Sequence, residues 1–151
     1  MRAILIVDVQ ERCFKRYDAA LLHRINSRIT EAQADGQEIV YIKNTKRLRG
    51  GAFTDEFALG LMVVTDNVFC KEQADAFSSG ALEAYLHSKG VSEVELMGVD
   101  GNSCISASAK GAMRRGFDVV IDPSCVGAAN ALRFEGTKEM LSSMGVVLKQ
   151  G

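Results

Sequence analysis

Short segments rich in isoleucine and valine alternate along this chain with longer segments in which apolar side chains recur at helical spacing. The first apolar run covers residues 3–7 and ends at Asp8, and a helix is predicted over residues 19–34, with Gly36 as its stop. Further strands are predicted at residues 38–42, 62–64, 93–97, 118–121 and 146–148, and further helices at residues 75–89, 103–115 and 127–142. This alternation predicts a three-layer α/β/α fold, doubly wound and Rossmann-like, with a mostly parallel sheet.

The length and charge of the chain limit its domain organisation and its partners. One hydrophobic core commonly serves 151 residues, so residues 1–151 are expected to form a single domain. A formal net charge of −1, with 25% charged residues spread along the chain, favours neither nucleic acid nor a membrane surface as partner. This charge balance makes a small molecule the expected ligand. Because no apolar run approaches the roughly 18 residues that a membrane span needs, a cytoplasmic protein is expected. The four cysteines form no C-x-x-C pair and are expected to be reduced.

Three polar side chains follow predicted strands, where ligands of open α/β sheets bind. Asp8 ends the first strand, Lys71 follows "VVTDNVFC", and Cys104 follows "VELMGVDGNS". Cys104 stands at the start of a predicted helix, where backbone N–H groups and the helix dipole favour a thiolate. Each of the three also has a structural alternative: Asp8 can cap the strand, Lys71 can be solvated, and Cys104 can be a packed thiol. A Cys–His dyad is disfavoured, because His23 and His87 lie inside predicted helices, away from this edge.

Three separated motifs resemble those of the isochorismatase-like cysteine hydrolases, a family that includes nicotinamidases and N-carbamoyl amidohydrolases. The motifs are "AILIVDVQ", "FCKEQADAFSSGALEAYL" and "ELMGVDGNSCISASAKGAMRRGFDVVI", and the resemblance covers nearly the whole chain. It implies a six-stranded parallel sheet flanked by helices and a catalytic triad of Asp8, Lys71 and Cys104. It also implies a cis peptide bond between Val99 and Asp100, and an oxyanion hole formed by the backbone N–H groups of Asp100 and Cys104.

The reaction that the resemblance implies is hydrolysis of a C–N bond in a small amide or carbamoyl compound. Asp8 takes the thiol proton, the sulfur of Cys104 attacks the carbonyl carbon, and water later hydrolyses the thioester. Because the reference pKa of a thiol lies well above that of an aspartic acid, the proton transfer is uphill by roughly 6 kcal/mol in water. We expect Lys71 and the helix N-terminus to close part of this gap by lowering the pKa of the Cys104 thiol.

Two departures from the family pattern affect the expected site. Residues 44–60 contain no histidine, whereas nicotinamidases of the family bind a metal in the corresponding region, so we expect no metal and no other cofactor. Gly101 stands where the family often has threonine, and we expect it to loosen the loop or to let a substrate approach the backbone closely.

The expected substrate pocket is formed by side chains in and near the motifs. Its predicted wall consists of Gln10, Cys13, Phe14, Phe53 and Phe77. Oligomers are common among similar proteins, so a homo-oligomer, either a dimer or a tetramer, is also expected. Two other functions stay open on the same scaffold: a non-catalytic relative that binds a metabolite or partner, and a thiol redox sensor that uses Cys104 and Cys13.

Overall fold

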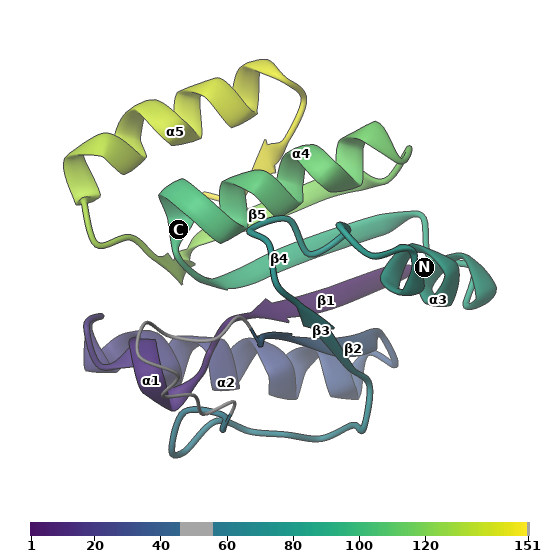
Figure 1. The fold of residues 1–151 in the computed structure, drawn as a ribbon, viewed down its shortest axis with the longest axis horizontal. Helices are drawn as coiled ribbons and strands as arrows, with labels where there is room; N and C mark the ends of the chain where they lie inside the picture. The colour runs from purple at the N-terminus through teal and green to yellow at the C-terminus, as the bar shows by residue number, and fades with distance from the viewer. Residues whose placement is uncertain (46–55, 151) are drawn as a thin grey trace.

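A computed structural model describes residues 1–45 and 56–150, which form a central sheet with helices on both faces (Figure 1). The sheet has six strands in the order β3-β2-β1-β4-β5-β6, and all neighbouring strands are parallel. The strands are β1 (Arg2–Val7), β2 (Glu38–Asn44), β3 (Val68–Lys71), β4 (Glu93–Val99), β5 (Asp118–Gly127) and β6 (Val147–Leu148). The helices are α1 (Glu11–Phe14), α2 (Ala19–Ala34), α3 (Gly80–Ser88), the π-helical turn η2 (Gly101–Ile105), α4 (Ser106–Arg114) and α5 (Ala131–Ser143). The predicted α/β class is confirmed, with a sheet that is wholly parallel.

The strand order reverses between β1 and β4, at the centre of the sheet. After β1 the chain adds β2 and β3 on one side, and it then returns to place β4 on the other side of β1. Ligands of open α/β sheets bind at such a reversal, beyond the carboxyl ends of the strands. Asp8 directly follows β1 and Asp100 directly follows β4, so the fold brings two of the predicted site segments next to each other.

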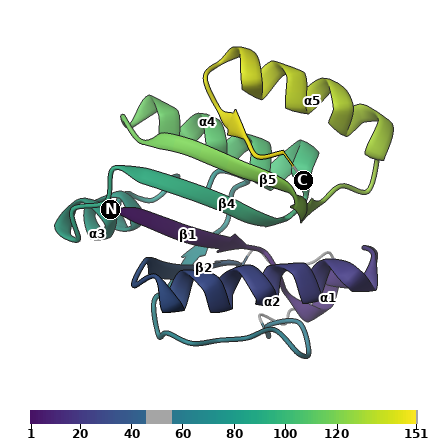
Figure 2. The same cartoon turned by 180° about the vertical axis from the view of Figure 1, so that it is seen from behind.

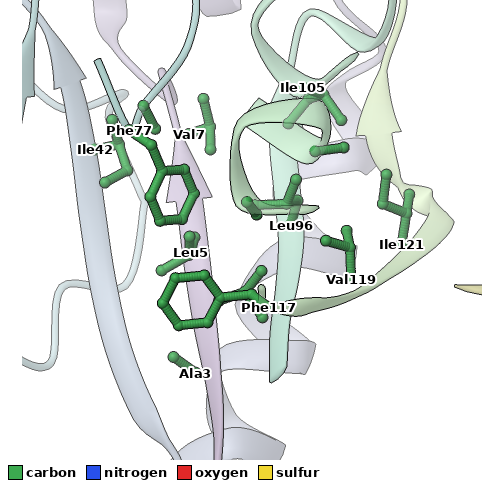
Figure 3. Packing of buried hydrophobic residues seen from close by; sticks show 14 of the residues in the cluster. Ala3, Leu5, Val7, Ile42, Phe77, Leu96, Ile105, Phe117, Val119 and Ile121 are labelled. Carbon is green, nitrogen blue, oxygen red and sulfur yellow. The ribbon is translucent and has the colours of Figure 1, made fainter. Parts of the chain in front are cut away.

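Each face of the sheet has its own hydrophobic cluster. Helices α1 and α2 cover one face, and α3, α4 and α5 cover the other (Figures 1 and 2). Strand β1 is buried between the two layers, so Leu5 packs on the α3–α5 side and Ile6 on the α2 side. Figure 3 shows Phe77 and Phe117 beside Leu5 in the first of these clusters. Burial on both faces explains why this strand reads as a continuous apolar run.

The strand predicted at residues 62–64 is not a strand. This segment instead packs beside Tyr41 of β2, whose hydroxyl donates to the carbonyl oxygen of Met62 at 2.7 Å and accepts from the N–H of Val64 at 3.0 Å. The strand of this region is β3, a few residues later. Helix α3 correspondingly begins at Gly80, later than the predicted residue 75.

Strand β5 is longer than predicted and reaches Gly127, so α5 begins only at Ala131. Its register on β4 shifts between the pairs Leu96–Ile121 and Gly98–Val126, which leaves a bulge that contains Pro123. A proline is tolerated in a bulge because its missing N–H removes no ladder hydrogen bond there. After the bulge, β5 rejoins β4 near its carboxyl end, where the site segments lie. Within the described part of the chain, no helix is long and apolar enough to span a membrane.

Candidate active site

The close approach of β1 and β4 positions Asp8. A Cβ atom at Gly98 would lie only 2.1 Å from the carbonyl oxygen of Val7, so no other residue fits there without a backbone shift. Asp8 itself has a φ of 56°, in the left-handed region that non-glycine residues adopt at a cost and often at functional sites. Its N–H donates to the carbonyl oxygen of Ile42 at 3.0 Å, which ties this turn to β2.

The three residues predicted for the triad lie together at the carboxyl edge of the sheet. The Nζ atom of Lys71 lies 3.0 Å from Oδ2 of Asp8 and 3.4 Å from Sγ of Cys104. Its third partner is the carbonyl oxygen of Gln73, at 3.0 Å. The ammonium group thereby has an acceptor for each of its three N–H bonds. Both charged side chains are buried, so the ammonium holds the carboxylate and the sulfur in a fixed arrangement.

The second carboxylate oxygen of Asp8 has a different environment. Oδ1 is buried, and no residue in the described part of the chain makes a hydrogen bond to it. Buried carboxylate oxygens are almost always hydrogen-bonded, and an exception calls for an explanation. An acceptor of this kind, beside a thiol and a cavity, is placed to receive a proton.

Cys104 lies in η2, half-buried, directly before α4. Burial raises the pKa of the Cys104 thiol and the negative charge of Asp8 raises it further, whereas the Lys71 ammonium acts in the opposite direction. Lys71 lowers the thiol pKa as predicted, but its effect is outweighed, so the expected net lowering is wrong. The physical reason is that burial of the sulfur and the charge of Asp8 together outweigh the Lys71 ammonium. A raised pKa favours the neutral thiol over the thiolate.

The side chain of Asp100 anchors the segment between β4 and Cys104. The peptide bond between Val99 and Asp100 is cis, as the resemblance implied. The Asp100 carboxylate accepts hydrogen bonds from the hydroxyl of Tyr17 at 3.1 Å and from the N–H groups of Ala129 at 2.7 Å and Asn102 at 2.9 Å. Burial raises the pKa of Tyr17, and the Asp100 charge raises it further, so the hydroxyl stays a donor. The Asp100 carboxylate thus holds together the segments that contain Tyr17, Asn102 and Ala129.

An open cavity of about 620 Å³ lies against these residues, with Asp8, Asp100 and Cys104 in its wall. Of the predicted pocket residues, Gln10 and Cys13 line it. Phe14 and Phe77 do not: Phe14 packs in the cluster beneath α2, and Phe77 is fully buried against β1 on the opposite face. Both aromatic side chains are part of the hydrophobic core, because burying their apolar surface between helix and sheet is favourable. Phe53 lies outside the described residues.

Sequence reasoning missed several residues that line the cavity, among them the polar side chains of Arg12, Arg16, Tyr17 and Asn44. The first three come from α1 and the connection to α2, directly beyond the carboxyl end of β1. The rule that ligands bind beyond the strand ends would have drawn attention to this segment, "ERCFKRY". Neither histidine lines the cavity, and His87 instead faces Glu83 on α3 at 3.4 Å.

Gln10 holds Asn44 at the rim of the cavity. Its Oε1 accepts from the N–H of Asn44 at 2.8 Å, and its Nε2 donates to the carbonyl oxygen of Asn44 at 3.1 Å. The side-chain amide therefore continues the pairing of β1 with β2 beyond the last backbone pair. These two hydrogen bonds make Gln10 a positioning residue for the cavity wall.

Gly101 has a packing role that differs from the expected one. A Cβ atom at this position would lie 2.6 Å from the ring of Phe134 in α5. The glycine is required so that η2 can pack beneath that ring, and the prediction that it brings a substrate to the backbone is not supported by this contact.

A metal site does not fit the side chains around the cavity. Within residues 1–45 and 56–150, no group of three His, Cys, Asp or Glu side chains is arranged to hold a metal ion. The sequence between residues 44 and 60 adds no histidine. The absence of a metal stays a prediction.

Comparisons with known proteins give a family and two relatives with named activities. The family described as the isochorismatase domain matches residues 2–150. Maleamate amidohydrolase of Pseudomonas putida is 42% identical over 60 residues, which cover 40% of this chain and 28% of that protein. Streptothricin hydrolase of Streptomyces noursei is 28% identical over 131 residues, 80% of this chain and 48% of that protein. The matches thus span less than half the length of these two relatives.

The fold is also found in solved structures. An isochorismatase family protein from Desulfovibrio vulgaris superposes with a TM-score of 0.89, over 97% of this chain and 92% of that one. At 19% sequence identity, this likeness shows the fold alone.

Proposed function

Because the chain belongs to the isochorismatase family of hydrolases, we propose that it is a cysteine hydrolase that cleaves the C–N bond of a small amide or carbamoyl compound. The observation that carries this proposal is the position of the Lys71 ammonium, 3.0 Å from the Asp8 carboxylate and 3.4 Å from the Cys104 sulfur. A buried acid, a buried cation and a thiol at one wall of a cavity provide a base and a nucleophile for acyl transfer. The names of the two relatives, an amidohydrolase and a hydrolase, support the same class of reaction.

The first half of the reaction begins from a neutral thiol, because the pKa of Cys104 is raised by burial and by Asp8. As the sulfur bonds to the carbonyl carbon, the thiol proton passes to the free oxygen of Asp8, and the carbonyl electron pair moves onto oxygen. Coupling the proton transfer to the attack avoids a free thiolate, which this site disfavours. The backbone N–H groups of Asp100 and Cys104 are the proposed donors to the oxyanion.

The second half of the reaction restores the resting state. The proton on Asp8 passes to the nitrogen of the tetrahedral intermediate, the C–N bond breaks, and ammonia or an amine leaves from a thioester on Cys104. Water then attacks the thioester carbon while Asp8 takes one of its protons. When the C–S bond breaks, the proton returns to sulfur and the acid is released. Lys71 keeps the carboxylate in place through their ion pair.

A covalent intermediate on Cys104 tests this function. The protein is mixed with a panel of small amides and N-carbamoyl compounds, quenched in acid and analysed by mass spectrometry, while ammonia release is followed in parallel. We expect an acyl mass on the peptide that carries Cys104, and no acyl mass or ammonia with Cys104→Ala. Cys125→Ala is the matched control, because Cys125 is buried in the cluster beneath α2 and does not line the cavity.

The redox-sensor alternative predicts a different result. Cys13 and Cys104 line the same cavity, but burial raises the pKa of the Cys13 thiol and the Asp8 charge raises it further. Two neutral thiols react slowly with oxidants, which disfavours this function. No acyl adduct across the panel, together with a reversible disulfide between Cys13 and Cys104 under mild peroxide, would overturn the hydrolase proposal in favour of the sensor.

A further inference from the structure

Two arginines line the cavity that holds the reactive thiol, and the proposed chemistry uses neither of them. Arg12 lies in α1, and Arg16 lies in the connection that follows it. The acidic groups of the site already have partners: Asp8 pairs with Lys71 at 3.0 Å, and the Asp100 carboxylate accepts three hydrogen bonds. The charged residues that line the cavity are two arginines and two aspartates, and the carboxylates of both aspartates are engaged within the protein.

Arg16 carries most of this inference. Its side chain is exposed, and no ion pair joins it to any residue of the described part of the chain. Burial raises the pKa of the Cys13 thiol and of the Tyr17 hydroxyl, and in both cases the Arg16 charge acts in the opposite direction. Both of these groups line the cavity, so the guanidinium lies near its wall and is open to a ligand.

Arg12 adds a second positive charge that is held in place. Its Nη2 donates to the carbonyl oxygen of Asn44 at 3.0 Å, and the same carbonyl accepts from Gln10. The chain of contacts from the buried Gln10 through Asn44 fixes this guanidinium at the rim of the cavity.

On the basis of the proposed amide hydrolysis, we propose that the substrate is a small amide that also carries a carboxylate, and that Arg16 binds this carboxylate. A planar guanidinium pairs with a carboxylate through two parallel N–H···O bonds, which fixes orientation as well as charge. Binding the acid at Arg16 would leave the amide carbon for Cys104. Monoamides of short dicarboxylic acids and N-carbamoyl amino acids combine the two groups. A cavity of about 620 Å³ is of the size that small-molecule sites have.

Matched substrates and variants test the inference. Succinamate carries a carboxylate where succinamide carries a second amide, and N-carbamoylglycine represents the N-carbamoyl amino acids. Ammonia release gives kcat and KM for each compound. We expect the protein to prefer the acids, and Arg16→Gln to raise KM for them about tenfold with kcat little changed, as for the loss of a charge-assisted hydrogen bond. Arg16→Lys should fall between. Arg133→Gln, which removes the same charge from exposed α5, is the control and should behave as the unmodified protein.

A binding measurement separates this inference from the proposed function. In Cys104→Ala, the affinity for uncleaved succinamate is measured by calorimetry, with and without Arg16→Gln and at two salt concentrations. Arg16-dependent binding that weakens with salt, without hydrolysis in the unmodified protein, would leave the carboxylate site standing and reject amide hydrolysis. Hydrolysis of succinamide and succinamate at equal kcat/KM, unaffected by Arg16→Gln, would reject the carboxylate site and leave the hydrolase. If the protein neither hydrolyses nor binds any of the acids, the inference is wrong.

Discussion

Two buried carboxylates, one within β4 and one just beyond β1, have opposite surroundings. Glu95 lies toward the amino end of β4 and is fully buried, whereas Asp8 lies just beyond the carboxyl end of β1. Both oxygens of Glu95 are taken: the donors to Oε1 are Arg2 at 3.1 Å, Arg28 at 3.1 Å and Lys149 at 3.0 Å, and Arg28 also donates to Oε2 at 3.0 Å. Asp8 has one partnered oxygen and one without a partner among the described residues.

The difference shows how to tell a structural carboxylate from a reactive one in this fold. A buried acid with both oxygens hydrogen-bonded to cations has no position for a further proton or ligand, and its loss removes the anion that those cations share. A buried acid with one free oxygen keeps a position for a proton. The two groups should therefore respond to the same isosteric change in different ways, one in activity and the other in stability.

The largest effect is expected from Asp8→Asn. The amide keeps the shape but cannot accept the thiol proton as a base, so ammonia release should fall by about a thousandfold or more. The rate is measured with the amide that the unmodified protein cleaves fastest, and circular dichroism checks that the variant is folded. A rate within tenfold of the unmodified protein would show that the free oxygen has no role in the reaction.

A smaller effect, on stability, is expected from Glu95→Gln. The neutral side chain leaves three cations without their shared anion, so the free energy of unfolding should fall by about 3 kcal/mol, measured by urea denaturation. Glu93→Gln is the control: Glu93 lies on the same strand, but its side chain is 32% exposed and its pair with Arg2 should contribute less than about 1 kcal/mol. The turnover number per folded molecule should not change. Lost turnover at full stability would break the distinction between the two acids.

The smallest effect is expected in the alkylation of Cys104. Because burial and the Asp8 charge raise the pKa of this thiol, its rate of reaction with iodoacetamide should keep rising with pH above the range of an ordinary cysteine. Removing the negative charge in Asp8→Asn lowers that pKa, so the rate at neutral pH should increase several-fold while hydrolysis is lost. The exposed Cys70 serves as the internal reference in both proteins. A slower reaction in the variant would contradict the assigned influence of Asp8.

The sequence predicted the sheet best where strands are buried on both faces. Strands β1, β2 and β4 appear as apolar runs because helices cover both of their sides. Strand β3 was misplaced because it is a four-residue edge strand with mostly accessible side chains. The apolar run before it, at residues 61–64, owes its composition to packing beside Tyr41, which no periodicity reveals.

The candidate site was predictable in its members but not in its electrostatics. Asp8 follows β1, Lys71 ends β3 and Cys104 comes after β4, so their convergence at one edge follows from the parallel topology and from the family motifs. The direction of the thiol pKa shift was not predictable, because it depends on how deeply the sulfur is buried and on the Asp8 charge beside it. Arg16 and Tyr17 were missed because a short helix, α1, decides where their connection lies.

The reversal of strand order at the centre of the sheet has a consequence for how such proteins diverge. Asp8 and the segment that bears Cys104 emerge from adjacent buried strands, whereas Arg12 lies in α1 and Arg16 in the exposed connection that follows it. Changes of charge at Arg12 and Arg16 would therefore alter the proposed selectivity and leave Asp8 and Cys104 in place, whereas Tyr17 of the same segment is tied to Asp100. New selectivity in this fold should arise first in that connection.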